Sequence, residues 1–124
     1  MFAMFGQPSS LSLAFRMEEL KNRNDYSKAM MPDGLAVLEG VTTICPNCKA
    51  IAPKVEELMK KYPDARFYQY NVDEAEDIAQ ELGARQVPSF NFFVDGMIVG
   101  GVTGAKADEL EKLIKENYDG KVVD

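Results

Sequence analysis

Two cysteines, Cys45 and Cys48, are separated by two residues and are the only cysteines among the 124 residues of the chain. Thiols at this spacing can close a small disulfide ring and reopen it by thiol–disulfide exchange. An apolar run over 35–44 leads into the pair, and a helix-forming stretch over 49–61 follows it. A thiol at the start of a helix faces unpaired backbone N–H groups and the positive end of the helix dipole, which favour the reactive thiolate. The pair therefore predicts thiol–disulfide oxidoreductase chemistry.

The position of each cysteine predicts its role. Cys45 precedes the helix and is expected near the surface, where it would attack a substrate disulfide as the nucleophile. Cys48 lies one turn into the helix and is expected to be more buried, where it would resolve the mixed disulfide. The competing interpretations are half of a zinc site and a pair without function. Zinc takes four ligands, and the chain has no histidine and no further cysteine to complete such a site, so no metal is expected.

Glu39 stands in the middle of the most apolar stretch of the chain, where an ionised carboxylate is costly to bury. Burial would raise the pKa of this carboxyl. Placed behind the cysteines, it would accept the proton of Cys48 during resolution. Two alternatives remain at this point: the side chain escapes to solvent, or it pairs with a lysine and only tunes the local field.

Composition limits the class of protein. A chain of 124 residues forms one domain with a sizeable core. The net charge of -6 and the absence of a basic cluster argue against nucleic acid as a partner. No stretch approaches the roughly 18 apolar residues of a membrane helix. Arg16 follows the apolar part of the N-terminus, which argues against a secretory signal, and one arginine is too few for a mitochondrial address. We therefore expect a cytoplasmic protein in a reducing compartment, where a CxxC pair is more often catalytic than structural.

Hydrophobic periodicity predicts the element order β-α-β-α-β-α-β-β-α, an α/β fold. The expected strands cover 11–17, 35–43, 65–72, 89–94 and 97–102, and the expected helices lie within 18–31, over 49–61, after a capping box at 73–76 and around 110–114. The last two strands are expected to form a hairpin with a type I′ turn at Asp95-Gly96. The charged stretches over 54–61 and 106–116 are interpreted as solvated helix faces. The expected organisation is a flexible leader over 1–9, one domain over 10–118 and a tail over 119–124.

Several separated motifs over 11–118 resemble the thioredoxin family in the same order: the strand ending at a CxxC, Lys49, Pro53, Asn71-Val72-Asp73, Val87-Pro88-Ser89 and Val102-Thr103-Gly104-Ala105. The resemblance implies a thioredoxin-like fold, with helices flanking a central mixed sheet of strand order 1-3-2-4-5. It also implies an enzyme that reduces disulfides in partner proteins and receives electrons from a thioredoxin-reductase-type donor. The two sulfurs would carry the electrons, so no bound cofactor is expected.

The resemblance further implies a substrate-binding surface around the cysteines. The peptide bond before Pro88 would be cis and face the disulfide, and the backbone of Val87 would pair with an extended substrate strand. An ordinary trans proline is the alternative. Ile44, Pro46 and Asn47 flank the cysteines and complete the expected surface.

The chain also departs from the family pattern. Thioredoxins carry Trp-Cys-Gly-Pro-Cys, whereas here Ile44 precedes the first cysteine and Pro46 follows it, as in glutaredoxins. The family's buried aspartate falls on Glu39, and the lysine near that aspartate falls on Gln69. Two alternative functions follow. One is a glutaredoxin-like enzyme that uses glutathione, favoured by Pro46 and by the pair Gly100-Gly101, and the other is a non-enzymatic binding module with this fold.

Overall fold

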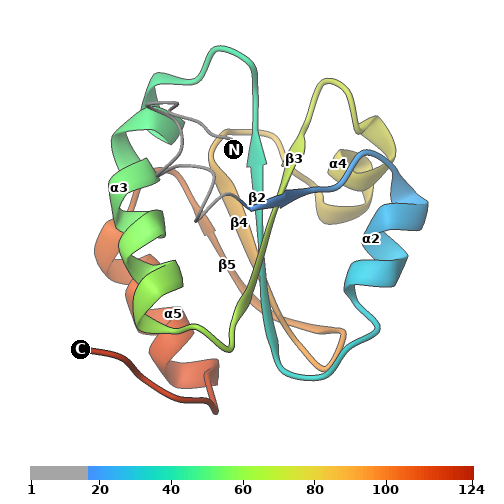
Figure 1. Cartoon of the computed structure of the whole chain (residues 1–124). Helices are drawn as coiled ribbons and strands as arrows, with labels where there is room; N and C mark the ends of the chain where they lie inside the picture. The colour runs from blue at the N-terminus through green and yellow to red at the C-terminus, as the bar shows by residue number, and fades with distance from the viewer. Residues whose placement is uncertain (1–16) are drawn as a thin grey trace, which may run out of the picture.

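A five-stranded mixed sheet forms the centre of the computed structural model, which describes residues 17–124 (Figure 1). The strands are β1 (Glu18–Glu19), β2 (Leu35–Val41), β3 (Arg66–Asn71), β4 (Ser89–Val94) and β5 (Met97–Thr103). Their order across the sheet is β1-β3-β2-β4-β5. β3 runs parallel to β1 and β2, and β4 runs antiparallel to β2 and β5. This arrangement confirms the expected fold and strand order. The first strand of the described residues lies at Glu18–Glu19, after the expected range of 11–17, and only two of its residues pair with β3.

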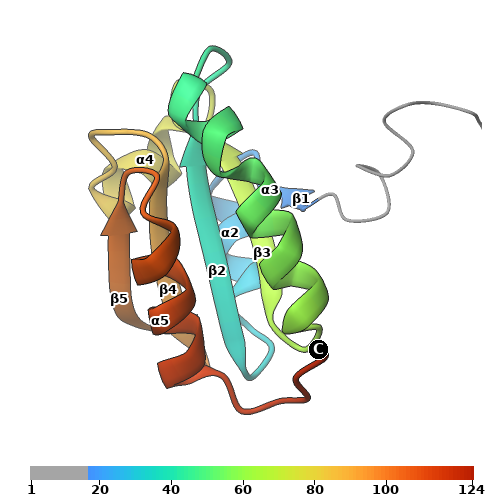
Figure 2. The same cartoon turned by 90° about the vertical axis from the view of Figure 1, so that its left-hand side faces the viewer.

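Within residues 17–124, four helices cover the two faces of the sheet (Figures 1 and 2). On one face lie α3 (Pro46–Lys61) and α5 (Ala107–Asn117), and on the other lie α2 (Arg23–Ala29) and α4 (Glu76–Leu82). None of the helices within residues 17–124 is long and apolar enough to span a membrane. From the end of β2 the chain passes through a loop into α3 (Figure 2).

The alternating side chains of β2 divide the core into two clusters. Leu35 and Val37 pack toward α3 and α5, whereas Ala36 and Leu38 pack toward α2 and α4. β2 is therefore buried on both faces, as its apolar sequence predicts. By the same alternation, the side chain of Glu39 points toward the layer of α3 and α5.

Helix α3 buries a stripe of residues spaced three and four apart: Ile51, Val55, Leu58 and Tyr62. Cys48 lies three residues before Ile51 and continues this stripe toward the beginning of the helix. Pro46 occupies the first turn, where a missing N–H is tolerated, and the helix continues through Pro53. The packing of α3 on β2 therefore carries the second cysteine toward the sheet.

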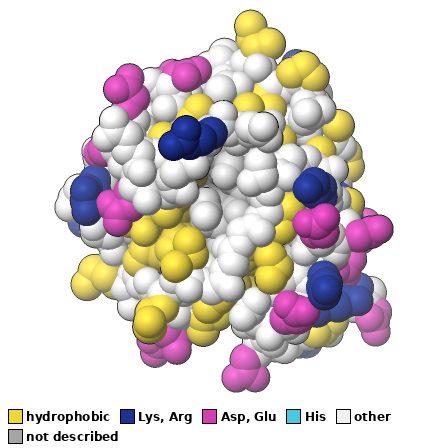
Figure 3. Space-filling model, turned by 180° about the vertical axis from the view of Figure 1, so that it is seen from behind, with side chains coloured by type: hydrophobic (Ala, Val, Ile, Leu, Met, Phe, Trp, Pro, Cys, Tyr) yellow, Lys and Arg dark blue, Asp and Glu magenta, His cyan; other side chains and the backbone are white. Residues whose placement is uncertain are grey.

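Strand β5 forms one edge of the sheet and carries three exposed apolar side chains, Met97, Ile98 and Val99. Seen from behind, hydrophobic side chains are visible on this face between charged ones (Figure 3). The ladder between β4 and β5 shifts register between Phe92 and Phe93. An irregularity of this kind at an edge strand weakens the template for further strand pairing.

One local expectation is wrong, and several others concern residues outside the described part of the chain. The capping box at 73–76 is wrong, because α4 begins after Ala75, which makes no side-chain capping hydrogen bond. Asn71 organises this turn instead, since its Oδ1 accepts the N–H groups of Asp73 and Glu74. The leader over 1–9, the domain boundary at residue 10 and the strand expected over 11–17 lie, except for Met17, outside the described residues.

Candidate active site

The two cysteines form a disulfide at the N-terminus of α3, with their Cα atoms 5.2 Å apart. Cys45 is the N-cap residue of the helix, and its Sγ accepts the backbone N–H of Cys48 at 3.1 Å. The first turn of a helix has unpaired N–H groups and the positive end of the helix dipole. These donors stabilise negative charge on the sulfur of Cys45, as the sequence predicts for a cysteine at a helix start.

The relative burial of the two cysteines is the reverse of the expectation. Cys45 is only 5% exposed, whereas Cys48 is half-buried. The capping hydrogen bond explains the difference, because it folds the side chain of Cys45 back over the first turn of the helix. Exposure alone would favour Cys48 as the attacking cysteine, so the assignment to Cys45 rests on its capping position.

The loop before Cys45 presents an apolar side chain to solvent. Ile44 is 85% exposed, and Pro46 and Asn47 on the other side of Cys45 are exposed as well. Thr42 Oγ1 donates to the carbonyl of Ile44 at 2.9 Å, which fixes the loop locally. Three exposed residues therefore flank the buried Cys45 in the chain.

Asn71 connects this loop to the neighbouring strand, a role that the sequence analysis missed. Its Nδ2 donates to Thr43 Oγ1 at 3.3 Å, while its Oδ1 caps the turn before α4. The usable sequence signal was an asparagine at the end of a strand, where its side chain commonly hydrogen-bonds a following turn. The loop before the cysteines and the turn after β3 are thus held together.

The segment before β4 lies at the same end of the sheet as the loop that carries Cys45. Ser89 pairs with Gly40, near the end of β2, so Pro88 lies beyond that end. The peptide bond between Val87 and Pro88 is cis in the structure. Pro88 is fully buried and its carbonyl accepts the N–H of Gly104 at 2.8 Å, whereas Val87 is half-buried. Val87 and Pro88 therefore stand at the end of the sheet where β2 leads into the cysteine loop.

Glu39 is buried, with 3% of its surface exposed, so escape of its side chain to solvent is excluded. Its Oε1 accepts a hydrogen bond from Gln69 Nε2 at 3.2 Å, and its partner is thus an amide and no lysine. Burial raises the pKa of Glu39 to about 7, and the hydrogen bond from Gln69 offsets part of that rise. The side chain of Glu39 points from β2 toward the helix layer in which Cys48 lies, in the first turn of α3.

Other candidate sites lie away from the cysteines. A groove of about 890 Å³ runs along the outer side of α3 between Lys49 and Asp124, and neither cysteine lines it. Among residues 17–124, no group of three or more histidine, cysteine, aspartate or glutamate side chains could hold a metal ion. The ionisable or redox-active groups described at this end of the sheet are the two sulfurs and the buried carboxyl of Glu39.

A disulfide closed across the first turn of a helix, at the end of a mixed sheet and in the same layer as a buried carboxyl, defines a thiol–disulfide oxidoreductase with a thioredoxin-like fold. The family model described as Thioredoxin matches residues 17–116. Thioredoxin AMT13 of Alternaria alternata is 38% identical over 102 residues, covering 82% of this chain and 86% of its own. Thioredoxin-1 of Schizosaccharomyces pombe is 34% identical over 101 residues, covering 82% of this chain and 98% of its own.

Solved structures agree with these sequence relatives. The oxidised mitochondrial thioredoxin 3 of Saccharomyces cerevisiae superposes with a TM-score of 0.78 at 33% identity, covering 81% of this chain and 94% of its own. The chain belongs to the thioredoxin family, and it is a thiol–disulfide oxidoreductase.

Proposed function

We propose that this member of the thioredoxin family reduces disulfide bonds in partner proteins, with Cys45 as the nucleophile and Cys48 as the resolving cysteine. One observation carries the assignment: the N–H of Cys48 is directed at the sulfur of Cys45, at the N-cap of α3. The sulfur that receives this N–H is the better stabilised thiolate, and the thiolate is the attacking species in exchange.

The reaction proceeds in two exchange steps. The thiolate of Cys45 attacks one sulfur of the substrate disulfide, forms a mixed disulfide and releases the other substrate sulfur as a thiolate. Cys48 then loses its proton and attacks the Cys45 sulfur, which closes the Cys45–Cys48 disulfide and releases the second substrate thiolate. The substrate gains two electrons and takes up protons from the medium, while the two cysteines are oxidised.

Glu39 is the proposed base for the second step. A carboxyl with a pKa raised to about 7 is matched to proton transfer near neutral pH. Its side chain points from β2 toward the helix layer in which Cys48 continues the buried stripe of α3. The carboxylate would accept the proton of Cys48 as this sulfur attacks and would later return it to solvent.

Substrate binding is proposed at the surface around the sulfurs. The exposed side chain of Ile44 supplies an apolar contact, and Pro46 and Asn47 flank it. The half-buried Val87 would pair through its backbone with an extended segment of the substrate, next to Pro88. Backbone pairing is independent of substrate side chains, so this surface suits disulfides in many proteins.

Return of the protein to its dithiol form requires two electrons from outside the chain. We propose a thioredoxin-reductase-type donor, as the family membership implies, and no bound cofactor beyond the dithiol. Cytoplasmic location stays a prediction from the sequence.

The glycines that favoured a glutathione-dependent enzyme have packing explanations. A Cβ atom at Gly100 would lie 3.2 Å from Leu113 Cδ2, and one at Gly101 would lie 3.1 Å from the carbonyl oxygen of Phe90. Close packing within the fold therefore accounts for both positions, and reduction of protein disulfides is the better supported proposal.

Trapping tests the assigned roles. The Cys48→Ser variant should accumulate a mixed disulfide with a disulfide-containing protein, detected as an adduct by mass spectrometry and removed by dithiothreitol. The matched Cys45→Ser variant should form little adduct, because its remaining thiol lacks the capping N–H. An adduct that forms through Cys48 in Cys45→Ser, and none in Cys48→Ser, would reverse the two roles.

A further inference from the structure

We infer that the hydrogen bond between Asn71 and Thr43 is a latch that positions the loop before Cys45, so that both are positioning residues for attack on a protein disulfide. The inference deepens the proposed function and rests on it. Asn71 Nδ2 donates to Thr43 Oγ1 at 3.3 Å. This latch joins the end of β3 to the loop over 42–44, two residues before the proposed nucleophile.

Asn71 is a well-fixed support for this loop. Its backbone carbonyl accepts the N–H groups of Glu74 and Ala75 at 3.1 and 2.7 Å, and its Oδ1 accepts those of Asp73 and Glu74 at 2.9 and 3.3 Å. Its backbone also pairs with Val41 at the end of the ladder between β2 and β3. Because backbone N–H groups only donate, they identify Oδ1 and leave the donor end of the amide, Nδ2, for the loop.

The loop has few other restraints. Strand pairing ends at Val41, whose carbonyl accepts the N–H of Val72 at 2.8 Å. Thr43 and Ile44 are both exposed, so packing against the core does not hold them. Thr42 Oγ1 donates to the carbonyl of Ile44 at 2.9 Å, but this bond closes within the loop. Among the side-chain hydrogen bonds of residues 17–124, the latch alone ties the loop to another element.

The latch acts on the presentation of Ile44 and not on the attacking sulfur. The sulfur of Cys45 is held from the helix side, because it accepts the N–H of Cys48 at the start of α3. Ile44 stands between Thr43 and Cys45 and is the exposed apolar residue of the proposed substrate surface. Without the latch the thiolate stays stabilised, but Ile44 must be ordered when a protein substrate binds, which costs entropy. A small disulfide needs no such surface.

The test compares attack on a protein disulfide with attack on a small one. Reduced protein is mixed with insulin, and oxidation of its two cysteines is followed by acid quenching, alkylation and mass spectrometry. In parallel, 5,5′-dithiobis(2-nitrobenzoate) reports attack through the absorbance of the first thiolate released. In Thr43→Val, which removes the acceptor and keeps the shape, the rate constant with insulin should fall about threefold while that with the small disulfide stays unchanged. Thr43→Ser keeps the hydroxyl and should restore the rate with insulin.

A double-mutant cycle checks that the two residues act together. Asn71→Ala removes the latch and the hydrogen bonds of the turn, so its effect on the insulin rate should be at least that of Thr43→Val. Adding Thr43→Val to Asn71→Ala should slow the reaction no further. Thermal unfolding shows whether each variant is folded, and Thr43→Val with Thr43→Ser decides the matter if Asn71→Ala is not. Ser27→Ala removes an exposed hydroxyl of α2 and should leave both rates unchanged.

The outcomes separate this inference from the proposed function. Equal rates with insulin in Thr43→Val and the parent would overturn the latch and leave the proposed function standing. A loss of the same size with both disulfides would also overturn it, because the thiolate itself would then be affected. A further loss in the double variant would mean that Thr43 acts without Asn71. If the parent attacks the small disulfide but not insulin, the proposed reduction of protein disulfides is wrong, and the inference fails with it.

Discussion

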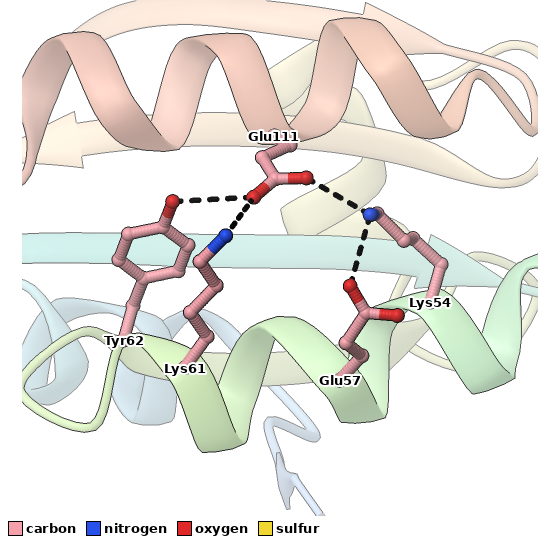
Figure 4. A network of polar contacts seen from close by, with 5 residues as sticks. All are labelled: Lys54, Glu57, Lys61, Tyr62 and Glu111. Carbon is pink, nitrogen blue, oxygen red and sulfur yellow. Dashed lines mark hydrogen bonds and ion pairs between the residues drawn. The ribbon is translucent and has the colours of Figure 1, made fainter. Parts of the chain in front are cut away.

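Two glutamates in the layer of α3 and α5 have opposite environments. Glu111 accepts hydrogen bonds from Lys54, Lys61 and Tyr62 between the two helices (Figure 4). The hydrogen bonds from the two lysines, that from Lys54 first, lower its pKa to about 2. Glu39 has one neutral partner, and burial raises its pKa to about 7. The same side chain is therefore fixed in its ionised form at one place and changes its protonation state near neutral pH at the other.

The difference between the two pKa values follows from the charge of the neighbouring groups and from the access of each carboxyl to water. Glu111 keeps some exposure, with 17% of its side chain accessible, and meets two cations. Glu39 lies inside the sheet layer and meets apolar groups and one amide. A carboxyl that serves to link two helices needs charge partners, whereas one that exchanges a proton at neutral pH must lack them. Each of the following changes removes one side of this contrast.

The largest expected effect is the pH dependence of stability caused by Glu39. Its pKa is higher in the folded state than the ordinary value of 4.5, so the folded state binds more protons between about pH 4.5 and 7. Stability must then fall as pH rises through this window, by about 3 kcal/mol. Glu39→Gln should match the parent protein below the window and exceed its free energy of unfolding above it, as measured by urea denaturation. Equal curves for both proteins would contradict burial of an ionisable Glu39.

The catalytic counterpart concerns the resolving step. Without its carboxylate, Glu39→Gln should resolve the mixed disulfide about a hundredfold more slowly at pH 7, within the usual range for loss of a general base. A quenched-flow time course should show the mixed disulfide accumulating before it decays. Glu111→Gln is the control, and it should resolve at the parental rate because Glu111 lies in the contact between α3 and α5. Equal slowing in both variants would contradict a special role for Glu39.

The sequence predicts the fold well because hydrophobic periodicity determines which faces are buried. β2 and α3 match their apolar patterns, and the turn at Asp95-Gly96 has positive φ at both residues, as a type I′ turn requires. Glu39 was also recognisable, since a carboxyl within a buried strand is conspicuous in any sequence. The start of α4 was not recognisable from the sequence. Asp73 has the spacing of a capping box, but the side chain that accepts hydrogen bonds in this turn is Asn71 of the preceding strand.

Features that depend on distant contacts escaped the sequence. The stretches over 54–61 and 106–116 predicted solvated helix faces, yet Lys54 and Lys61 reach Glu111 across the contact between α3 and α5. Their sequence separation hides a pairing that only the packing of the two helices creates. The burial of Cys45 was missed for a related reason, since the direction of one capping side chain decides it.

Removal of Glu111 should produce a smaller effect of opposite sign to that of Glu39. Its folded pKa is depressed, so its contribution is present above the ordinary value of 4.5 and is lost as pH falls from there to about 2. At pH 7, Glu111→Gln should lower the free energy of unfolding by about 1–2 kcal/mol, allowing for solvent screening of partly exposed ion pairs. The difference from the parent should shrink in 1 M salt and become small as pH falls through about 2. A difference that keeps its full size at pH 2 would point to lost packing instead of lost charge.

The smallest expected effect is the loss of the Tyr62 hydroxyl, which donates to Glu111 alongside the two lysines. Tyr62 Oη donates to Glu111 Oε2 at 3.2 Å, while its ring packs edge-on against Tyr118 with centroids 5.0 Å apart. Tyr62→Phe removes the hydrogen bond and keeps the ring, so the free energy of unfolding should fall by about 0.5–1 kcal/mol. Lys54 and Lys61 still hold the carboxylate ionised in this variant, so its acid titration should keep the parental shape. A loss as large as that of Glu111→Gln would mean that the hydroxyl, and not the two cations, distinguishes Glu111 from Glu39.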